Sequence, residues 1–147
     1  MLMRLPGNAG HIFLHPHIRL ATIHTRPMGK PRMTRRDRWA KRPVVQKWNS
    51  YKDVVRLSVP PGFQFPLSDF WVIFTFKPPK SWLISDAIES YGSPHQVVPD
   101  KDNLEKGIID IFLPKNDSKV FDGRVTKVWG PHDKIEIWWQ ENGLGAG

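Results

Sequence analysis

Residues 70–76 form an apolar run, FWVIFTF, that Thr75 alone interrupts. Successive side chains of a β-strand point to opposite faces of its sheet, so a run that is apolar at neighbouring positions predicts a strand buried on both faces. This strand constrains the fold most, because a sheet built around it must be covered on both sides. The run is much shorter than the roughly 20 apolar residues of a membrane-spanning helix, and we expect no membrane partner.

Hydrophobic periodicity predicts the other elements, in the order β-loop-α-β-α-α-β-β. The expected strands are residues 18–24, 70–76, 120–129 and 134–140, and the expected helices are residues 44–57, 81–91 and 103–113. One side of the first helix is apolar at helical spacing, and it consists of Val44, Trp48, Tyr51 and Val55.

The last two strands are expected to pair as a hairpin across the Gly-Pro turn at residues 130–133. Alternation then turns Ile135, Ile137 and Trp139 toward the core. Trp138 lies on the opposite side of the same strand and is expected to face solvent, DNA or a partner subunit.

The chain is 147 residues long, which fits one compact domain with a moderate core. The element order predicts an α+β fold in which a small mixed sheet packs with two or three helices. We expect this single domain to span residues 1–147, with an extended N-terminal segment at 1–16 and a flexible tail at 141–147. Cysteine is absent, which excludes disulfides and thiolate metal sites and suits a reducing cytoplasm.

Hard oxygen ligands cluster where the third helix is expected to begin. Residues 99–106 read PDKDNLEK, and a third carboxylate follows at Asp117. Asp102 with Glu105 is typical of a capping box, which predicts that the helix starts just after Asp102. In the extended segment before the helix, Asp100 and Asp102 are two residues apart and lie on one side, so both can approach one cation. Mg²⁺ takes one or two protein carboxylates with water and phosphate oxygens, and the pattern outlines such a site.

The same helix has a second interpretation, in which its polar face is purely structural. Asp102, Lys106 and Asp110 follow one another at i, i+4 spacing. A solvated ladder of this kind stabilises a helix by roughly 0.5 kcal/mol or less per pair, and the pattern by itself favours neither interpretation. Gly107 lies inside the helix, where glycine costs roughly 1 kcal/mol relative to alanine. The close approach of a neighbouring strand would explain this glycine.

Positive charge is concentrated in residues 26–42, which we call the basic segment. The net charge of +8 and the pI near 10 indicate a polyanionic partner. Within the basic segment eight cations stand against Asp37 alone, and glycine and proline mark it as a loop. Trp39 is its candidate for base stacking, and a merely solvated loop is the alternative. The cations expected to contact phosphates are Lys30, Arg32, Arg35, Arg36 and Arg38.

Histidines offer two further candidates. Four of them lie between His11 and His24, but no cysteine or carboxylate accompanies them, so we do not expect a zinc site there. His95 lies five residues before Asp100, the first carboxylate of residues 99–106, which we call the acidic stretch. It is expected either to contact phosphate or metal-bound water, or to be a structural imidazole.

Taken together, these motifs resemble the RusA family of Holliday-junction resolvases, many of which are encoded by phages. The resemblance is carried by PDKDNLEK at 99–106 with Asp110, and by NDSKV at 116–120. It extends to GKPRMTRRDRW at 29–39, PPKSW at 78–82, GSPH at 92–95 and RVTKVWG at 124–130. The ordered set covers most of the chain and is more specific than any single Asp-x-Asp.

The resemblance implies a homodimeric, Mg²⁺-dependent endodeoxyribonuclease, with Mn²⁺ as a substitute, that cuts four-way DNA junctions symmetrically. It assigns Asp100, Asp102 and Asp117 as catalytic metal ligands and Lys106 as a catalytic lysine. The basic segment and His95 would contact the DNA. The implied role is recombination and repair in the cytoplasm of a bacterial or phage-infected cell.

Two alternatives to this function stay open. The first is a non-catalytic, basic DNA- or RNA-binding module, whose acids only cap and solvate a helix. The second is a resolvase that binds junctions without cutting them, although the presence of Lys106 and all three acids argues against it.

Overall fold

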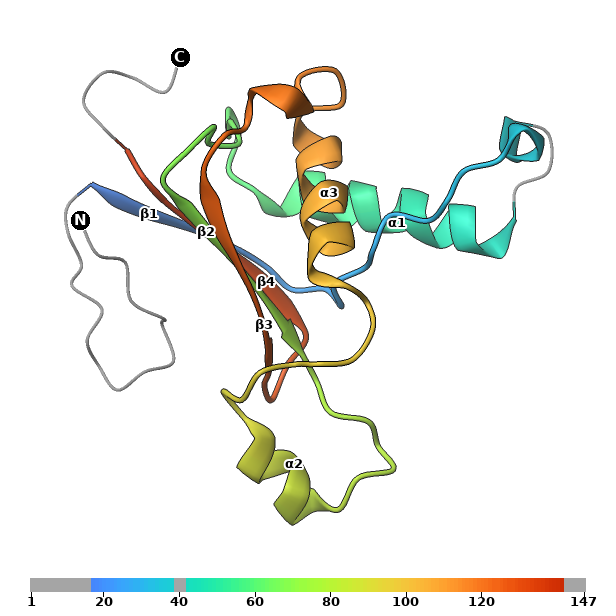
Figure 1. Cartoon of the computed structure of the whole chain (residues 1–147), viewed down its shortest axis with the longest axis vertical. Helices are drawn as coiled ribbons and strands as arrows, with labels where there is room; N and C mark the ends of the chain where they lie inside the picture. Colours follow the sequence, from blue (N-terminus) through green and yellow to red (C-terminus); the bar gives the residue numbers. More distant parts are fainter. Residues whose placement is uncertain (1–16, 39–41, 142–147) are drawn as a thin grey trace.

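The computed structural model of the chain describes residues 17–38 and 42–141, and Figure 1 shows their arrangement. The elements are β1 (Ile18–Ile23), the 3₁₀ helix η1 (Arg35–Arg38), α1 (Pro43–Ser58), β2 (Phe70–Phe76), α2 (Ile84–Ser90), α3 (Lys101–Phe112), the 3₁₀ helix η2 (Asp117–Lys119), β3 (Gly123–Trp129) and β4 (Lys134–Gln140). This confirms the expected order of helices and strands. The expected features at residues 1–16, at Trp39 and in the tail after residue 141 lie outside the described residues.

The four strands form one mixed sheet in the order β1-β4-β2-β3. β2 pairs in parallel with β3 and antiparallel with β4, and β4 pairs antiparallel with β1. All seven residues of β2 are buried, as the apolar run predicted. The α+β class, a single small domain with a mixed sheet and helices, is therefore confirmed.

The expected hairpin between the last two strands is wrong. β2 lies between β3 and β4, so these strands are consecutive in sequence but do not pair with each other. The turn after β3 is tied to β2 instead, since the Gly130 amide donates a hydrogen bond to the Phe76 carbonyl at 3.0 Å. β2 is the most apolar strand, and a strand on each side of it satisfies its backbone groups and removes its edges from water.

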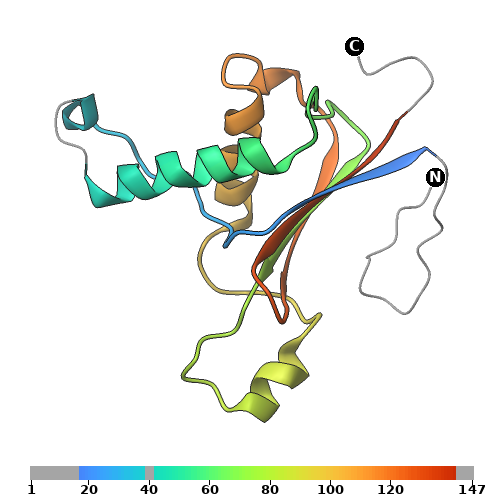
Figure 2. The ribbon, with the colours of Figure 1, turned by 180° about the vertical axis from the view of Figure 1, so that it is seen from behind.

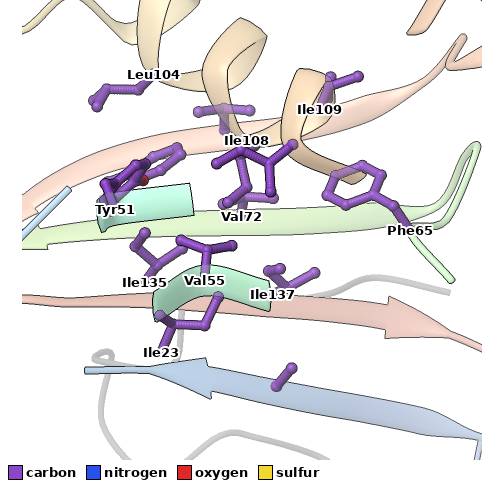
Figure 3. Close-up of a cluster of buried hydrophobic side chains, with 14 of the residues drawn as sticks. Ile23, Tyr51, Val55, Phe65, Val72, Leu104, Ile108, Ile109, Ile135 and Ile137 are labelled. Atoms are coloured by element: carbon purple, nitrogen blue, oxygen red, sulfur yellow. The ribbon is translucent and has the colours of Figure 1, made fainter. Parts of the chain in front are cut away.

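Helices α1 and α3 cover the same face of the sheet, as the two opposite views in Figures 1 and 2 show. Figure 3 shows side chains of both helices meeting those of the strands; Tyr51 and Val55 come from α1, Ile108 comes from α3, and Val72 and Ile137 come from the sheet. Burying each such aliphatic side chain contributes about 1.5–3 kcal/mol. This core fixes how α3, which carries the acidic stretch, lies on the sheet.

The buried side of α1 differs from the expected one at a single position. Trp48, Tyr51 and Val55 are buried, as predicted, but Val45 takes the place expected for Val44, which is 36% exposed. Helix α1 begins at Pro43, and its rotation sets which of the first two valines faces the sheet.

The opposite face of the sheet has a smaller apolar cluster made of Trp71, Ile73 and Trp138. The Trp71 indole donates a hydrogen bond to the Thr126 hydroxyl at 2.9 Å, and the Arg124 guanidinium lies 4.2 Å from the Trp71 ring centroid. Trp138 is only 8% exposed, so the expectation that it faces solvent, DNA or a partner is wrong. It packs on β2 neighbours because antiparallel pairing brings Trp71 directly opposite it.

Helix α2 has no buried residue and protrudes from the end of the sheet (Figure 1). Leu83, Ile84 and Ile88 are 70%, 80% and 57% exposed. In the part of the chain that the structure describes, no helix is both long and apolar enough to cross a membrane.

Candidate functional site

Helix α3 starts earlier than the capping box predicted. It begins at Lys101, and Asp100 is the N-cap residue, with extended backbone at φ −67° and ψ 147°. The Asp100 side chain makes no capping hydrogen bond, although its carbonyl accepts one from the Leu104 amide at 3.1 Å. Asp102 therefore lies in the first helical turn. The exposed Asp100 carboxylate is left available to a ligand.

The apolar side of α3 turns the polar residues of its first half outward. Leu104 and Ile108 are completely buried against the sheet, whereas Asp102 and Lys106 are exposed. Residues four apart lie on one face of a helix, so the Lys106 ammonium shares a surface with the Asp102 carboxylate. The structure thus brings Asp100, Asp102 and Lys106 to the N-terminal half of α3.

Asp117 lies beyond the other end of the same helix. It opens η2, after the 12 residues of α3 have ended at Phe112. A helix of that length spans about 18 Å, which is too far for one cation to bind carboxylates at both ends. Among residues 17–38 and 42–141 there is no group of three or more His, Cys, Asp or Glu side chains that could hold a metal ion. A single copy of the chain does not bring Asp117 to Asp100 and Asp102.

The polar face of α3 is tied to the basic segment. The Lys30 ammonium lies 2.7 Å from an Asp110 carboxylate oxygen, and the two side chains are 34% and 14% exposed. Asp110 therefore takes its ion-pair partner from the basic segment, and Lys30, expected to contact phosphate, is engaged in this pair. The half-buried position makes the pair more than a solvated surface contact.

The basic segment passes directly over the first half of α3. Gly29 packs so closely on the side chain of Asn103 that a Cβ atom there would collide with it. A Cβ atom on Gly107 would lie 3.1 Å from the Trp48 ring and 3.4 Å from the Lys30 amide nitrogen. The close approach expected from Gly107 is real, but Trp48 and the basic segment make it, and not a strand.

Three arginines expected to contact phosphate, Arg32, Arg35 and Arg36, are exposed, and η1, which carries two of them, lies beyond the start of α1 (Figure 1). The Arg42 guanidinium donates a hydrogen bond to the Arg32 carbonyl at 3.0 Å, which closes the segment into a loop. Arg38 belongs to η1, but its side chain lies outside the described residues. The basic segment therefore begins beside α3, at Gly29 and Lys30, and ends near the start of α1 (Figure 1).

His95, expected either to contact phosphate or metal-bound water or to be a structural imidazole, is buried. It is 4% exposed, and its ring centroid lies 4.0 Å from that of Phe76 and 4.3 Å from that of Trp129. Burial, together with the positive charges of Lys127 and Arg26, lowers the pKa of His95 from 6.5 to about 4. A buried neutral imidazole fits the structural alternative and not a phosphate contact. Of the other histidines, His11 and His15 lie outside the described residues.

Lys127 of β3 is a charged neighbour of the acidic stretch; it lies in the RVTKVWG motif at 124–130, but the motif assigned it no role. Its ammonium donates a hydrogen bond of 2.6 Å to the carbonyl of Val97, three residues before Asp100. Burial lowers the pKa of Lys127, and the Asp100 carboxylate acts in the opposite direction. The available signal was alternation, since Lys127 falls between Val125 and Trp129 on the core-facing side of its strand.

The family described as Endodeoxyribonuclease RusA matches residues 24–138, a range that includes the basic segment, the acidic stretch and all of the sheet except β1 and the end of β4. No curated protein matches the chain. The match covers most of the chain and contains Asp100, Asp102, Lys106 and Asp117. The chain belongs to the RusA endodeoxyribonuclease family.

Proposed function

We propose that this protein is a Mg²⁺-dependent endonuclease that resolves four-way DNA junctions by cutting them symmetrically, in recombination or repair. The arrangement of charged residues at the start of α3 is the main support for this function. There Asp100 makes no capping bond, Asp102 and Lys106 are exposed in the first turns, and the basic segment crosses beside them. Membership of the RusA family supports the nuclease class.

The donor set at the start of α3 fits a hard divalent cation. Asp100 and Asp102 would supply two carboxylates, which is the usual protein share for Mg²⁺, with Mn²⁺ as a substitute. A bound cation would supply Lewis acidity toward the scissile phosphate and toward the attacking water. Lys106, one helical turn from Asp102, would stabilise the negative charge that develops on the phosphate or the leaving oxygen.

The remote position of Asp117 supports a role for a second copy of the chain. Because α3 separates Asp117 from the other two acids, we propose that Asp117 of one protomer completes the site of its partner. A twofold dimer would do this twice and would present two equivalent sites. A four-way junction has approximate twofold symmetry, so two such sites would nick two opposing strands.

The exposed apolar side chains of α2 also support association. Leu83, Ile84 and Ile88, with Val98 at 80% exposed, form apolar surface on the connection that leads to Asp100. Apolar surface of this kind is typical of protein interfaces. We propose that it contributes to the contact between protomers.

DNA would be held mainly through its phosphates. Arg32, Arg35 and Arg36 are exposed cations on a loop, which suits contacts to backbone charge and to junction shape more than to base edges. The cysteine-free composition suits work in the cytoplasm of a bacterial or phage-infected cell.

The separation of Asp117 from Asp100 and Asp102 also supports a second function, binding without cutting. If the protein is a monomer, one chain offers Asp100 and Asp102 without Asp117. Such a chain would be a DNA- or RNA-binding module that does not cut.

One experiment separates the two functions. A synthetic four-way junction labelled on each strand in turn is incubated with purified protein, with and without Mg²⁺, beside a linear duplex of the same sequence. The nuclease proposal expects paired nicks at symmetric positions in the junction only, and only with Mg²⁺. Binding to the junction without any nick under all conditions would favour the binding module.

A further inference from the structure

Lys127 occupies a position on β3 where an apolar residue is expected. Its neighbours on the same side of the strand, Val125 and Trp129, are each 8% exposed, and its register partner on β2 is the completely buried Phe74. Lys127 itself is half-buried. Its aliphatic stem thus lies along the apolar face, while its ammonium extends to a polar partner.

That partner lies on the segment that delivers Asp100. Residues 92–95 are bound along the edge of β3, where the His95 amide donates to the Lys127 carbonyl at 3.0 Å and the Trp129 amide donates to the Ser93 carbonyl at 3.0 Å. The Lys127 side chain then donates to the Val97 carbonyl at 2.6 Å. One residue therefore holds this segment at two points, one through its backbone and one through its side chain.

Packing holds the next residues only weakly. Val97 is 54% exposed and Val98 is 80% exposed, so these two residues bury little side-chain surface that could fix the path of the chain. Pro99 is half-buried and lies beside Gly29 of the basic segment. A charged donor to a carbonyl forms a stronger hydrogen bond than a neutral donor. Among the hydrogen bonds of the described residues, the bond from the Lys127 side chain to the Val97 carbonyl is the last one before Asp100 that ties this segment to a strand.

We propose that Lys127 is a positioning residue of the nuclease site: by holding the Val97 carbonyl, it fixes where the Asp100 carboxylate stands relative to Asp102. The inference rests on the proposed function, since it concerns the carboxylates assigned there to the cation. Lys127 acts through the backbone of residues 97–100 and is not assigned a contact with the substrate.

The positioning role and a simple electrostatic role predict opposite effects on metal binding. As an isolated positive charge near Asp100, Lys127 would repel a divalent cation, and its removal would tighten metal binding. As the bond that holds Asp100 in place, its removal would loosen one of the two carboxylates and weaken metal binding. The sign of the change therefore decides between the two roles.

The test uses the full-length protein and three substitutions. Lys127→Met keeps the apolar stem and removes the donor, Lys127→Arg keeps the donor and the charge, and Lys134→Met is the control. Lys134 is a lysine of strand β4 whose ammonium pairs with Glu136 at 3.4 Å, and not with Val97. Three quantities are measured: Mn²⁺ affinity by calorimetry, hydrogen exchange of the Leu104 amide, which donates to the Asp100 carbonyl at 3.1 Å, and the Mg²⁺ concentration that half-saturates junction cutting.

The expected result for Lys127→Met is about tenfold weaker Mn²⁺ binding, a higher Mg²⁺ requirement and faster exchange of the Leu104 amide, with the melting temperature little changed. Lys127→Arg should restore most of each loss, and Lys134→Met should behave as the wild type. Tighter or unchanged Mn²⁺ binding in Lys127→Met, or unchanged exchange, would overturn the inference. If the Mn²⁺ affinities of the wild type and the variants follow the expected order but the wild type never cuts a junction, the proposed nuclease activity is refuted and the positioning role of Lys127 stands.

Discussion

The Lys30 ammonium and the Asp110 carboxylate lie 2.7 Å apart and join the basic segment to the helix that carries the acidic stretch. Because of this ion pair, we expect Lys30 to contribute to stability, unlike the exposed arginines that follow it in the basic segment. Lys30→Ala would leave the Asp110 side chain, which is 14% exposed, without its partner. We expect a loss of about 1 kcal/mol in the free energy of unfolding, measured by urea titration. An unchanged unfolding midpoint would show that the pair contributes nothing.

Arg35 and Arg36 are expected to act on binding and not on stability, because both are exposed in η1. Replacing either by alanine should weaken junction binding and reduce the slope of log affinity against log salt by about one unit for each phosphate that the protein no longer neutralises. Junctions of different sequence should be affected alike. Arg19→Ala serves as the control, since Arg19 pairs with Glu141 at the end of the sheet. Unchanged binding after both arginines are replaced would remove Arg35 and Arg36 from the DNA interface.

His95 should make stability depend on pH. In the folded chain its pKa is about 4, against an ordinary value of 6.5, so the folded protein keeps a neutral imidazole where the unfolded chain takes up a proton. Stability should therefore fall as the pH falls from 6.5 to 4, by roughly 3 kcal/mol in total, and should be independent of this group above pH 6.5.

His95→Phe keeps an aromatic ring between Phe76 and Trp129 and removes the titration. Urea unfolding at several pH values should show that this variant loses less stability than the wild type between pH 6.5 and 4. His132→Gln, in the exposed turn before β4, is the matched control and should follow the wild type. Equal pH dependence in His95→Phe and wild type would contradict the burial-lowered pKa.

Sharing of Asp117 between protomers predicts complementation. Asp100→Asn and Asp117→Asn proteins should each be inactive, but co-expressed together they should recover about a quarter of the wild-type nicking rate. Half of randomly assembled dimers are mixed, and each mixed dimer has one complete site of two. Asp100→Asn mixed with Asp102→Asn should stay inactive, because those two acids belong to the same half of the site. Recovery in neither mixture would place all three acids in one chain during cutting.

Metal identity should separate binding from cutting. Mg²⁺ and Mn²⁺ should support nicking, whereas Ca²⁺, which is larger and accepts looser geometry, should support junction binding with little turnover. Binding is measured by gel shift and cutting by strand-specific labels in the same samples. Undiminished cutting in excess chelator would exclude a cation from the reaction.

Local sequence patterns predicted the elements well, because periodicity reports which side of a helix or strand is buried. The run at β2 is an example, and so are Trp48, Tyr51 and Val55 on the apolar side of α1; all are buried as predicted. Strand pairing was predicted less well. The rule that consecutive strands pair failed for β3 and β4, since both pair with β2, a strand that two helices separate from them in sequence.

In the candidate site, too, the local arrangement was predictable from the sequence and the tertiary contacts were not. Asp100, Asp102 and Lys106 are close in sequence, and a helix start brings such residues together by local geometry. Asp117 is also close in sequence, but an intervening helix of 12 residues carries it to the far end. The predicted helix at residues 103–113 already implied this separation, although the motifs group the three acids as one site. The contacts of Lys30 with Asp110 and of Lys127 with Val97 depend on tertiary packing and were not predictable from local pattern.

Single-turnover cleavage of a four-way junction by Asp102→Asn tests whether the carboxylates at the start of α3 perform metal-dependent cutting. The control is Asp86→Asn, which changes another exposed carboxylate in the first turn of a helix, α2. We predict that Asp102→Asn cuts about 100-fold more slowly or worse while binding the junction as tightly as wild type or more tightly, since it removes negative charge that faces a polyanion. Asp86→Asn should cut normally. Cutting by Asp102→Asn at the wild-type rate would show that the Asp102 carboxylate takes no part in the reaction.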